Sequence, residues 1–298
     1  MEKKTSRRKI LKQLGLGSLA LGTVNSLSSF ISKDMQKNNN KLKGNVNHSV
    51  CWWTYNFIPL EELCQVVKKI GFNAIDLVAP KDWPTLQKNG IFSSMCNGAE
   101  INLVDGWNHK EFHSTLIKNY SDHIELVAKA GYKNLICFSG SRRGMDDETG
   151  MNNCVEGLKQ IMSLAEKNKV MIQMELLNSK VNHKDYMCDR SLWGVELVKR
   201  VGSPNFKLLY DIYHMQIDEG DVIRTIKGNQ QYFGHYHTGG VPGRHMIDET
   251  QELYYPAIIK AILETGFNDY VAQEFVSAAK EKDDKIAELK KAVKICDV

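Results

Sequence analysis

The chain has 298 residues, of which 42% are hydrophobic and 25% are charged, values that are ordinary for a globular protein. Its formal net charge of +4 arises in the first 44 residues, which hold ten Lys or Arg and two acidic residues; positions 45–298 carry 29 basic and 33 acidic residues. A nucleic-acid-binding surface is therefore not indicated. No apolar run in the body of the chain reaches the roughly 20 residues of a membrane span.

The N-terminal segment differs from the rest of the chain. Residues 6–12, SRRKILK, resemble a twin-arginine export signal, and a weakly apolar Gly/Leu/Ala stretch follows them. We expect residues 1–30 to be a signal of this type, residues 31–45 a disordered linker, and residues 46–298 the catalytic domain. The protein would then be periplasmic or otherwise exported. The alternative is a basic amphipathic helix, which would leave the protein in the cytoplasm.

Beyond the linker, short apolar runs alternate with longer helix-like segments. Eight such units in about 250 residues fit a single-domain α/β protein, a (β/α)₈ TIM barrel. An open doubly wound sheet typically has a Gly-rich turn after its first strand, and none is present there, so this alternative fold is not indicated. The expected strands are 48–55, 74–78, 91–97, 134–140, 170–177, 206–214, 232–238 and 270–276, and the expected helices are 59–71, one near 83–90, 111–131, 152–168, 191–200, 219–228, 255–265 and 279–295.

The seven cysteines are scattered along the body of the chain. None belongs to a C-x-x-C pair, so a structural zinc site is not indicated. Their spacing specifies no disulfide framework, and we expect most of them to be small buried hydrophobic residues.

Polar side chains stand at the ends of the last four expected strands. These are Glu175, Asp211, His237 and Glu274. In a (β/α)₈ barrel the carboxyl ends of the strands meet at the face that carries the active site. Three carboxylates that converge without a cation would repel one another, and burying an unpaired charge is costly. We therefore expect these residues to hold a divalent ion, Mn²⁺, Mg²⁺ or Co²⁺, with Zn²⁺ as an alternative.

The two glutamates at this face also suit proton transfer at carbon. Glu175 and Glu274 come from the fifth and eighth strands, so we expect them to flank a substrate as an acid–base pair. A glutamate with a pKa of about 4.3 is a weak base toward a carbon-bound proton. General acid–base catalysis supplies about 10²–10⁴-fold, so stabilisation of the developing enediolate charge by the ion should be needed as well.

Three stretches resemble the hydroxypyruvate isomerase family: LLYDIYHMQ, AQEF and above all GHYHTGGVPGRHMIDETQELYYPAI. That family lies within the xylose-isomerase-like barrels, together with D-tagatose 3-epimerase. The resemblance implies a metal held by Glu175, Asp211, His237 and Glu274, with the two glutamates as catalytic residues. It further implies that His214 and Arg244 bind substrate oxygens. His237 stands where some hydroxypyruvate isomerases have glutamine and the epimerases have histidine.

Other residues near the expected barrel mouth are candidates for substrate binding. His245 follows Arg244 in the glycine-rich loop, although an exposed loop histidine is an almost equal alternative. One of Trp52 and Trp53 should form an apolar wall, and we assign Trp52 to that role. Glu252 either positions Arg244 or caps the following helix, and one of the arginines at 142–143 is a weaker candidate for the mouth.

The sequence favours a metal-dependent isomerase that interconverts hydroxypyruvate and tartronate semialdehyde, or a similar small hydroxy-carbonyl compound. The alternative is an epimerase or isomerase of a free sugar or keto-sugar, which His237 and the export signal favour. A metal-dependent endonuclease on the same fold is disfavoured by the acidic balance of residues 45–298. We expect a small-molecule substrate, no nucleic acid and no stable membrane span; a homo-oligomer stays open.

Overall fold

A computed structural model describes residues 41–298 of the chain, and a compact unit spans Leu42–Val298. The expected signal at 1–30 and most of the expected linker lie outside the described residues. The end of that linker is fixed: the Lys43 amide donates to both carboxylate oxygens of Asp297 at 3.0 and 2.9 Å. The Asn45 side chain donates to the carbonyl of Val298 at 2.9 Å.

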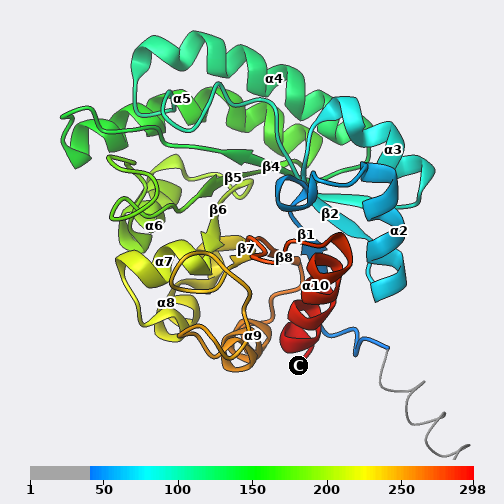
Figure 1. Cartoon of the computed structure of the whole chain (residues 1–298). Coiled ribbons are helices and arrows are strands. Elements are labelled where there is room, and N and C mark those ends of the chain that lie inside the picture. Colours follow the sequence, from blue (N-terminus) through cyan, green and yellow to red (C-terminus); the bar gives the residue numbers. More distant parts are fainter. Residues whose placement is uncertain (1–40) are drawn as a thin grey trace, which may run out of the picture. The chain divides into compact units, whose positions relative to one another are not determined.

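Within this unit, eight parallel strands form a nearly closed barrel surrounded by helices (Figure 1), as the sequence predicted. The strand order is β1-β8-β7-β6-β5-β4-β3-β2. An isolated parallel bridge between Cys51 and Asp76 joins the β1 and β2 edges. The strands are β1 (Asn47–Val50), β2 (Ala74–Val78), β3 (Phe92–Cys96), β4 (Asn134–Cys137), β5 (Met171–Glu175), β6 (Phe206–Asp211), β7 (Phe233–Thr238) and β8 (Tyr270–Gln273).

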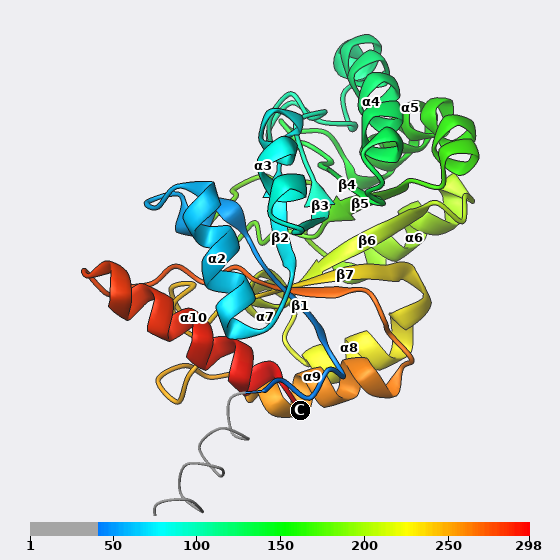
Figure 2. The same ribbon diagram turned by 90° about the vertical axis from the view of Figure 1, so that its right-hand side faces the viewer.

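Helices follow the strands and lie on the outside of the barrel, as Figure 2 shows from a second direction. The α-helices are α2 (Leu60–Ile70), α3 (Trp83–Lys88), α4 (His113–Lys129), α5 (Asp147–Asn168), α6 (Ser191–Val201), α7 (Ile212–Asp218), α8 (Val222–Asn229), α9 (Tyr255–Glu264) and α10 (Lys282–Cys296). Short 3₁₀ helices are η2 (Trp52–Tyr55), η3 (Pro80–Asp82), η4 (Lys110–Phe112) and η5 (Gln230–Tyr232).

Helix α2 shows how local sequence sets these boundaries. Pro59 occupies the N-cap position, Glu61 and Glu62 lie in the first turn, and Gly71 ends the helix at a φ of +117°. Acidic residues stabilise the positive end of the helix dipole, and glycine adopts the left-handed conformation without a steric cost. Leu63, Cys64, Val67 and Ile70 are buried, so one apolar stripe packs the helix against the barrel.

Several strand predictions ran past the observed carboxyl ends; the strands expected at 134–140 and 270–276, for example, end at Cys137 and Gln273. Two further cases show the reason. The strand expected at 48–55 ends at Val50, because the chain then turns into η2, with the Thr54 hydroxyl donating to the Cys51 carbonyl at 2.9 Å. The strand expected at 206–214 ends at Asp211, whose side chain accepts from the His214 amide at 3.1 Å and caps α7. Both differences occur at carboxyl ends of strands, where side chains rather than strand pairing determine the path of the backbone.

All seven cysteines are buried and free, as expected of small hydrophobic residues. None of the helices within residues 41–298 has the length and apolarity that a membrane crossing requires.

Candidate active site

The structure brings the four side chains predicted from the last four strands into one buried cluster. Glu175 and Asp211 end β5 and β6, His237 is the penultimate residue of β7, and Glu274 directly follows β8. One ligand atom from each lies within 4.8 Å of the others. Within the cluster His237 contacts both glutamates through Nδ1, which lies 2.8 Å from Glu274 Oε2 and 3.2 Å from Glu175 Oε1. The predicted convergence is therefore present in the fold.

Arg244 stands beside this cluster and provides positive charge. Its guanidinium lies 3.1 Å from Asp211 Oδ2, forms a close ion pair with Glu274, and lies 5.3 Å from the ring centroids of both Trp53 and Tyr213. Cation–π contacts of this kind hold a guanidinium between two aromatic faces. Arg244 is thus fixed at the edge of the cluster, between two aromatic rings.

His214 also points into the cluster with one free nitrogen. Its Nδ1 accepts from the Asn178 amide at 3.1 Å, so the ring proton lies on Nε2. Nε2 is buried, 3.6 Å from Asp211 Oδ2, and has no hydrogen-bond partner among the described residues. A buried donor without a partner is costly, and His214 is fully buried and does not line the cavity described below.

The charges of the cluster are strongly coupled. Burial raises the pKa of Glu175, and it raises the pKa of Asp211 to about 8 against the opposing effect of Arg244. Burial would also raise the pKa of Glu274, but Arg244 and His237 outweigh it and hold that pKa well below its usual value. The two glutamates therefore differ in protonation preference, a pattern typical of acid–base pairs.

A divalent ion fits these residues. Bonds of about 2.0–2.4 Å put the ligands of one ion within about 4.8 Å of one another, which agrees with the spacing of the four ligand atoms. Three carboxylates and one imidazole form an oxygen-rich donor set suited to Mn²⁺, Mg²⁺ or Co²⁺. An added dication would also supply the positive charge that Asp211 lacks for ionisation at neutral pH. Glu175, Asp211, His237 and Glu274 are thus the residues that would hold the ion.

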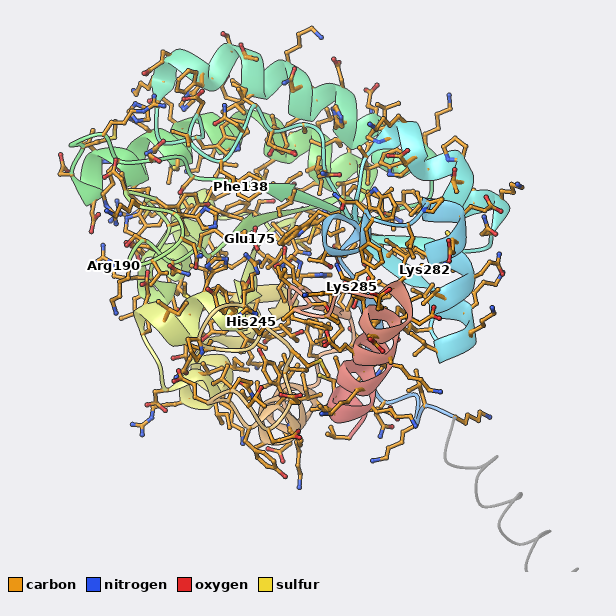
Figure 3. All side chains as sticks on the ribbon, in the orientation of Figure 1. Phe138, Glu175, Arg190, His245, Lys282 and Lys285 are labelled. Atoms are coloured by element: carbon orange, nitrogen blue, oxygen red, sulfur yellow. The ribbon has the colours of Figure 1, made fainter. Side chains whose placement is uncertain are left out.

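A cavity of about 650 Å³ opens above the cluster at the carboxyl ends of the strands. Figure 3 shows Phe138 and Glu175 near the centre of the barrel mouth. One side of the cavity is polar and the other is mainly apolar. Its lining comprises Trp53, Leu77, Glu100, Ile101, Asn102, Leu103, Val104, Phe138, Glu175, Leu177, His183, Arg244 and Glu274.

Two residues assigned to substrate binding lie elsewhere. Trp52 packs against the hydrophobic core, and its neighbour Trp53 lines the cavity and donates from Nε1 to Glu274 Oε1 at 2.7 Å. Trp53 lines the cavity instead of Trp52 because η2 turns the chain where an extended strand was expected. His245 is exposed on the loop after β7 (Figure 3), and its backbone pairs with Gly240, so its ring does not line the cavity. A Cβ at Gly240 would lie 2.5 Å from the Met246 carbonyl, which explains the glycine.

Sequence reasoning did not name His183 or Asp76, and it placed Trp53 second to Trp52. His183 lines the cavity from the loop after β5, where position along the chain predicts little. Asp76 on β2 is fully buried and lies 3.2 Å from His237 through its Oδ1. A signal for Asp76 was available, because an acidic residue stands inside the apolar run AIDLV. The two arginines at 142–143 do not line the cavity either. Arg142 pairs with Asp189 at 2.9 Å, and Arg143 pairs with Asp105.

Several relatives of known name support an isomerase. The chain is 24% identical to the hydroxypyruvate isomerase of Escherichia coli over 248 residues, covering 78% of this chain and 93% of that protein. It is 29% identical to the D-psicose 3-epimerase of Ruminiclostridium cellulolyticum over 199 residues, which span 62% of this chain and 64% of the relative. Several other curated relatives match over less than half of their own length.

The fold itself recurs in solved structures. The D-psicose 3-epimerase of Clostridium cellulolyticum H10, crystallised with D-tagatose, superposes with a TM-score of 0.69 and 18% identity, covering 84% of this chain and 98% of that one. The family model for xylose isomerase-like TIM barrels matches residues 64–296, most of the described unit. The chain therefore belongs to the xylose isomerase-like TIM barrel family.

Proposed function

We propose that the protein is a metal-dependent isomerase that interconverts a small hydroxy-carbonyl compound by moving a proton between Glu175 and Glu274. The observation that carries the proposal is the geometry of the cluster: both glutamates line the cavity and also contribute ligand atoms to the same group within 4.8 Å. A substrate held in that cavity would contact both carboxylates at once.

The ion, when bound by Glu175, Asp211, His237 and Glu274, supplies Lewis-acid stabilisation of negative charge on substrate oxygens. Arg244 and His214 assist through their donors. The guanidinium borders the cavity, and His214 Nε2 is a buried donor without a partner among the described residues. Arg244 can therefore orient a substrate oxygen in the cavity toward the glutamates, and His214 would donate to an oxygen that enters the cluster itself.

The different environments of the two glutamates match the starting state that a proton transfer needs, with one carboxylate ionised and the other protonated. Glu274, whose pKa is held low, is the carboxylate that removes a proton from carbon. Glu175, whose pKa burial raises, is the acid that returns one to the neighbouring carbon or to the opposite face. In the reverse reaction the two roles exchange. Trp53 donates to Glu274 Oε1 at 2.7 Å and so orients its other oxygen.

The relatives named as hydroxypyruvate isomerases support hydroxypyruvate as the substrate, with tartronate semialdehyde as the expected product. The size of the cavity favours the second candidate, a free sugar or keto-sugar. Hydroxypyruvate would fill roughly 200 Å³ if each non-hydrogen atom takes about the 30 Å³ of a water molecule, whereas the cavity measures about 650 Å³. Its apolar side also suits a larger substrate with an apolar face.

Hydrogen exchange with solvent tests the reaction class before the substrate is known. Full-length protein is incubated in heavy water with hydroxypyruvate or with a panel of ketoses, with and without Mn²⁺. We expect metal-dependent incorporation of deuterium at carbon for at least one compound, and the preferred compound separates the two candidates. Turnover without any incorporation in either set would contradict proton transfer through the glutamates.

We also propose export through the twin-arginine pathway, supported by the motif at residues 6–12. A fusion of residues 1–45 to a reporter should be exported, and replacing both Arg7 and Arg8 with lysine should retain the reporter inside the cell. Equal export of the two fusions would contradict the assignment.

A further inference from the structure

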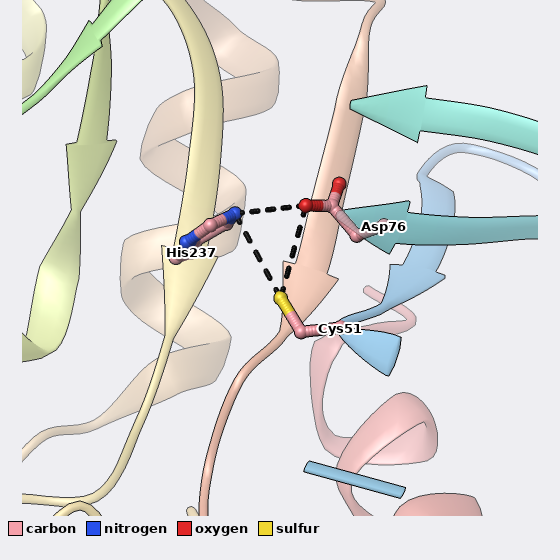
Figure 4. A group of neighbouring side chains, drawn as sticks. All are labelled: Cys51, Asp76 and His237. Atoms are coloured by element: carbon pink, nitrogen blue, oxygen red, sulfur yellow. Dashed lines mark hydrogen bonds and ion pairs between the residues drawn. The ribbon is translucent and has the colours of Figure 1, made fainter. Parts of the chain in front are cut away.

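The imidazole of His237 makes different contacts at its two nitrogens. Nδ1 faces the ligand cluster, 2.8 Å from Glu274 Oε2. Nε2 faces the opposite way, 3.2 Å from Asp76 Oδ1 on β2 (Figure 4). A neutral imidazole carries a proton on one nitrogen and a lone pair on the other. Both nitrogens thus face carboxylate oxygens, but only Nδ1 faces the place that an ion would occupy. With an ion held there, the Nδ1 lone pair would bind it and the Nε2 proton would be donated to Asp76.

Asp76 is itself held through its other carboxylate oxygen, Oδ2. The Ser94 hydroxyl donates to Oδ2 at 2.8 Å, and His235 Nε2 lies 2.8 Å from the same oxygen. Ser94 in turn contacts the Ser49 hydroxyl at 2.5 Å. Asp76, His235 and His237 are all fully buried. This network restrains the carboxylate so that its Oδ1 stays directed at His237.

The backbone around Asp76 is irregular, and this irregularity helps to direct the Asp76 side chain toward His237. The pairing of β2 with β3 shifts register on both sides of Asp76, and the next residue, Leu77, has a φ of +56°. Bulges of this kind redirect side chains and are common next to active sites. A branched residue at positive φ costs of order 1–3 kcal/mol and persists when its surroundings enforce it. Here Asp76 points into the barrel while Leu77 lines the cavity.

We propose that Asp76 is a positioning residue, which orients His237 and fixes the tautomer with Nδ1 free for the metal ion. The inference rests on the proposed metal site. Histidine ligands of metal ions commonly donate their other N–H to a carboxylate, and loss of that carboxylate typically weakens metal binding by about 10–100-fold. Asp76 supplies this carboxylate from the half of the barrel that contributes none of the four ligands.

The surroundings of Asp76 also contain a competing arrangement. Cys51 Sγ lies 3.8 Å from Asp76 Oδ1 and 3.9 Å from His237 Nε2, so these three side chains are close enough to hold a second ion (Figure 4). In that case His237 would bridge two ions and Asp76 would be a ligand. The two arrangements predict different metal stoichiometries and different effects of replacing Cys51.

The test measures Mn²⁺ binding to the metal-free full chain by calorimetry. Wild type should bind one ion, Asp76→Asn should bind it about 10–100-fold more weakly, and the matched variant Cys51→Ser should bind it like wild type. Two ions in wild type, one of them lost in Cys51→Ser, would overturn the proposal in favour of a second site. Unchanged affinity in Asp76→Asn would also overturn it, whereas no binding by wild type would refute the proposed function itself.

A second measurement does not depend on the variant folding. The ¹⁵N chemical shifts of the His237 ring in the wild-type protein loaded with Mg²⁺ report which nitrogen carries the proton. We expect an unprotonated Nδ1 and a protonated Nε2 whose shift is that of an N–H strongly hydrogen-bonded to a carboxylate, a signature that a merely structural role for Asp76 would not give. A proton on Nδ1 would overturn the proposal.

Discussion

The two halves of the barrel mouth contribute different chemistry to one cavity. Strands β5–β8 provide all four ligand residues, and the loop after β7 adds Arg244. Strands β1–β4 and their loops provide mainly apolar groups, with Glu100 and Asn102 as polar exceptions; the apolar ones include Leu77, Ile101, Leu103, Val104 and Phe138. The polar half therefore carries the charges of the ligand cluster, while the apolar half shapes the space around a substrate. The apolar half also provides Asp76, which contacts the nitrogen of His237 that faces away from the cluster.

The largest effect should follow from removing either glutamate of the polar half. Glu175→Gln and Glu274→Gln each keep the shape of the side chain but cannot take up a proton, so turnover should fall by about 10³-fold or more. Deuterium incorporation measured by NMR should fall in parallel. The control is Glu252→Gln, an exposed glutamate of the loop after β7 that accepts from Gln216; it should retain wild-type rates. Near-normal turnover in either active-site variant would refute its role.

Removing the metal should abolish turnover and lower the stability that the ion gives to the ligand cluster of the polar half. We expect chelation to abolish turnover and added Mn²⁺ to restore it. Binding at one hundred times the dissociation constant stabilises the folded state by about 2.7 kcal/mol, equivalent to roughly 5–10 °C in Tm. Thermal unfolding with and without Mn²⁺ measures this, and Asp211→Asn should show a much smaller shift. Identical melting curves for wild type with and without the ion would contradict a resident metal site.

The apolar half should affect substrate binding more than chemistry. Phe138→Ala removes an aromatic ring from the cavity wall and should reduce kcat/KM by about tenfold, mainly through KM, because the lost contact acts equally on substrate and transition state. Steady-state kinetics with the preferred compound tests this. Phe57→Ala, which removes an exposed ring outside the cavity lining, should leave KM unchanged. A fall in kcat alone would assign Phe138 to the chemical step instead.

The smallest effect on catalysis should come from His48 on β1, which affects stability. Burial lowers the pKa of His48 to about 4, although Asp297 acts in the opposite direction. The unfolded chain takes up this proton below about pH 6.5 and the folded chain only near pH 4. The free energy of unfolding should therefore fall as the pH drops from 6.5 to 4, by at most about 3 kcal/mol from this group. Urea unfolding of the metal-free protein at pH 7.0 and 4.5 measures the loss.

His48→Gln should reduce this pH dependence, whereas the exposed His245→Gln should retain the wild-type slope. A wild-type slope in His48→Gln would show that other groups are responsible.

The barrel and the ligand cluster were predictable because both depend on local patterns. Apolar runs alternate with amphipathic helices, and a charged residue at the end of an apolar strand is conspicuous. Knowing that carboxyl ends of parallel strands meet at one face was then sufficient to group Glu175 with Glu274. The prediction required no knowledge of how any loop folds.

The remaining residues depend on geometry that local patterns do not contain. The choice of Trp52 over Trp53 was wrong because η2 changes the direction of the chain one residue after β1. Asp76 carries the same signal as Asp211, an acid in an apolar strand, but its partner His237 lies across the barrel. Only the register shifts around Asp76 and the closing bridge to Cys51 bring the two together.

The most direct test of the account is a crystal structure of the protein grown with Mn²⁺, with the ion located by its anomalous scattering. The account predicts a single peak bonded to Glu175, Asp211, His237 Nδ1 and Glu274. A peak between Cys51 and Asp76, or none among the four side chains at saturating Mn²⁺, would contradict it.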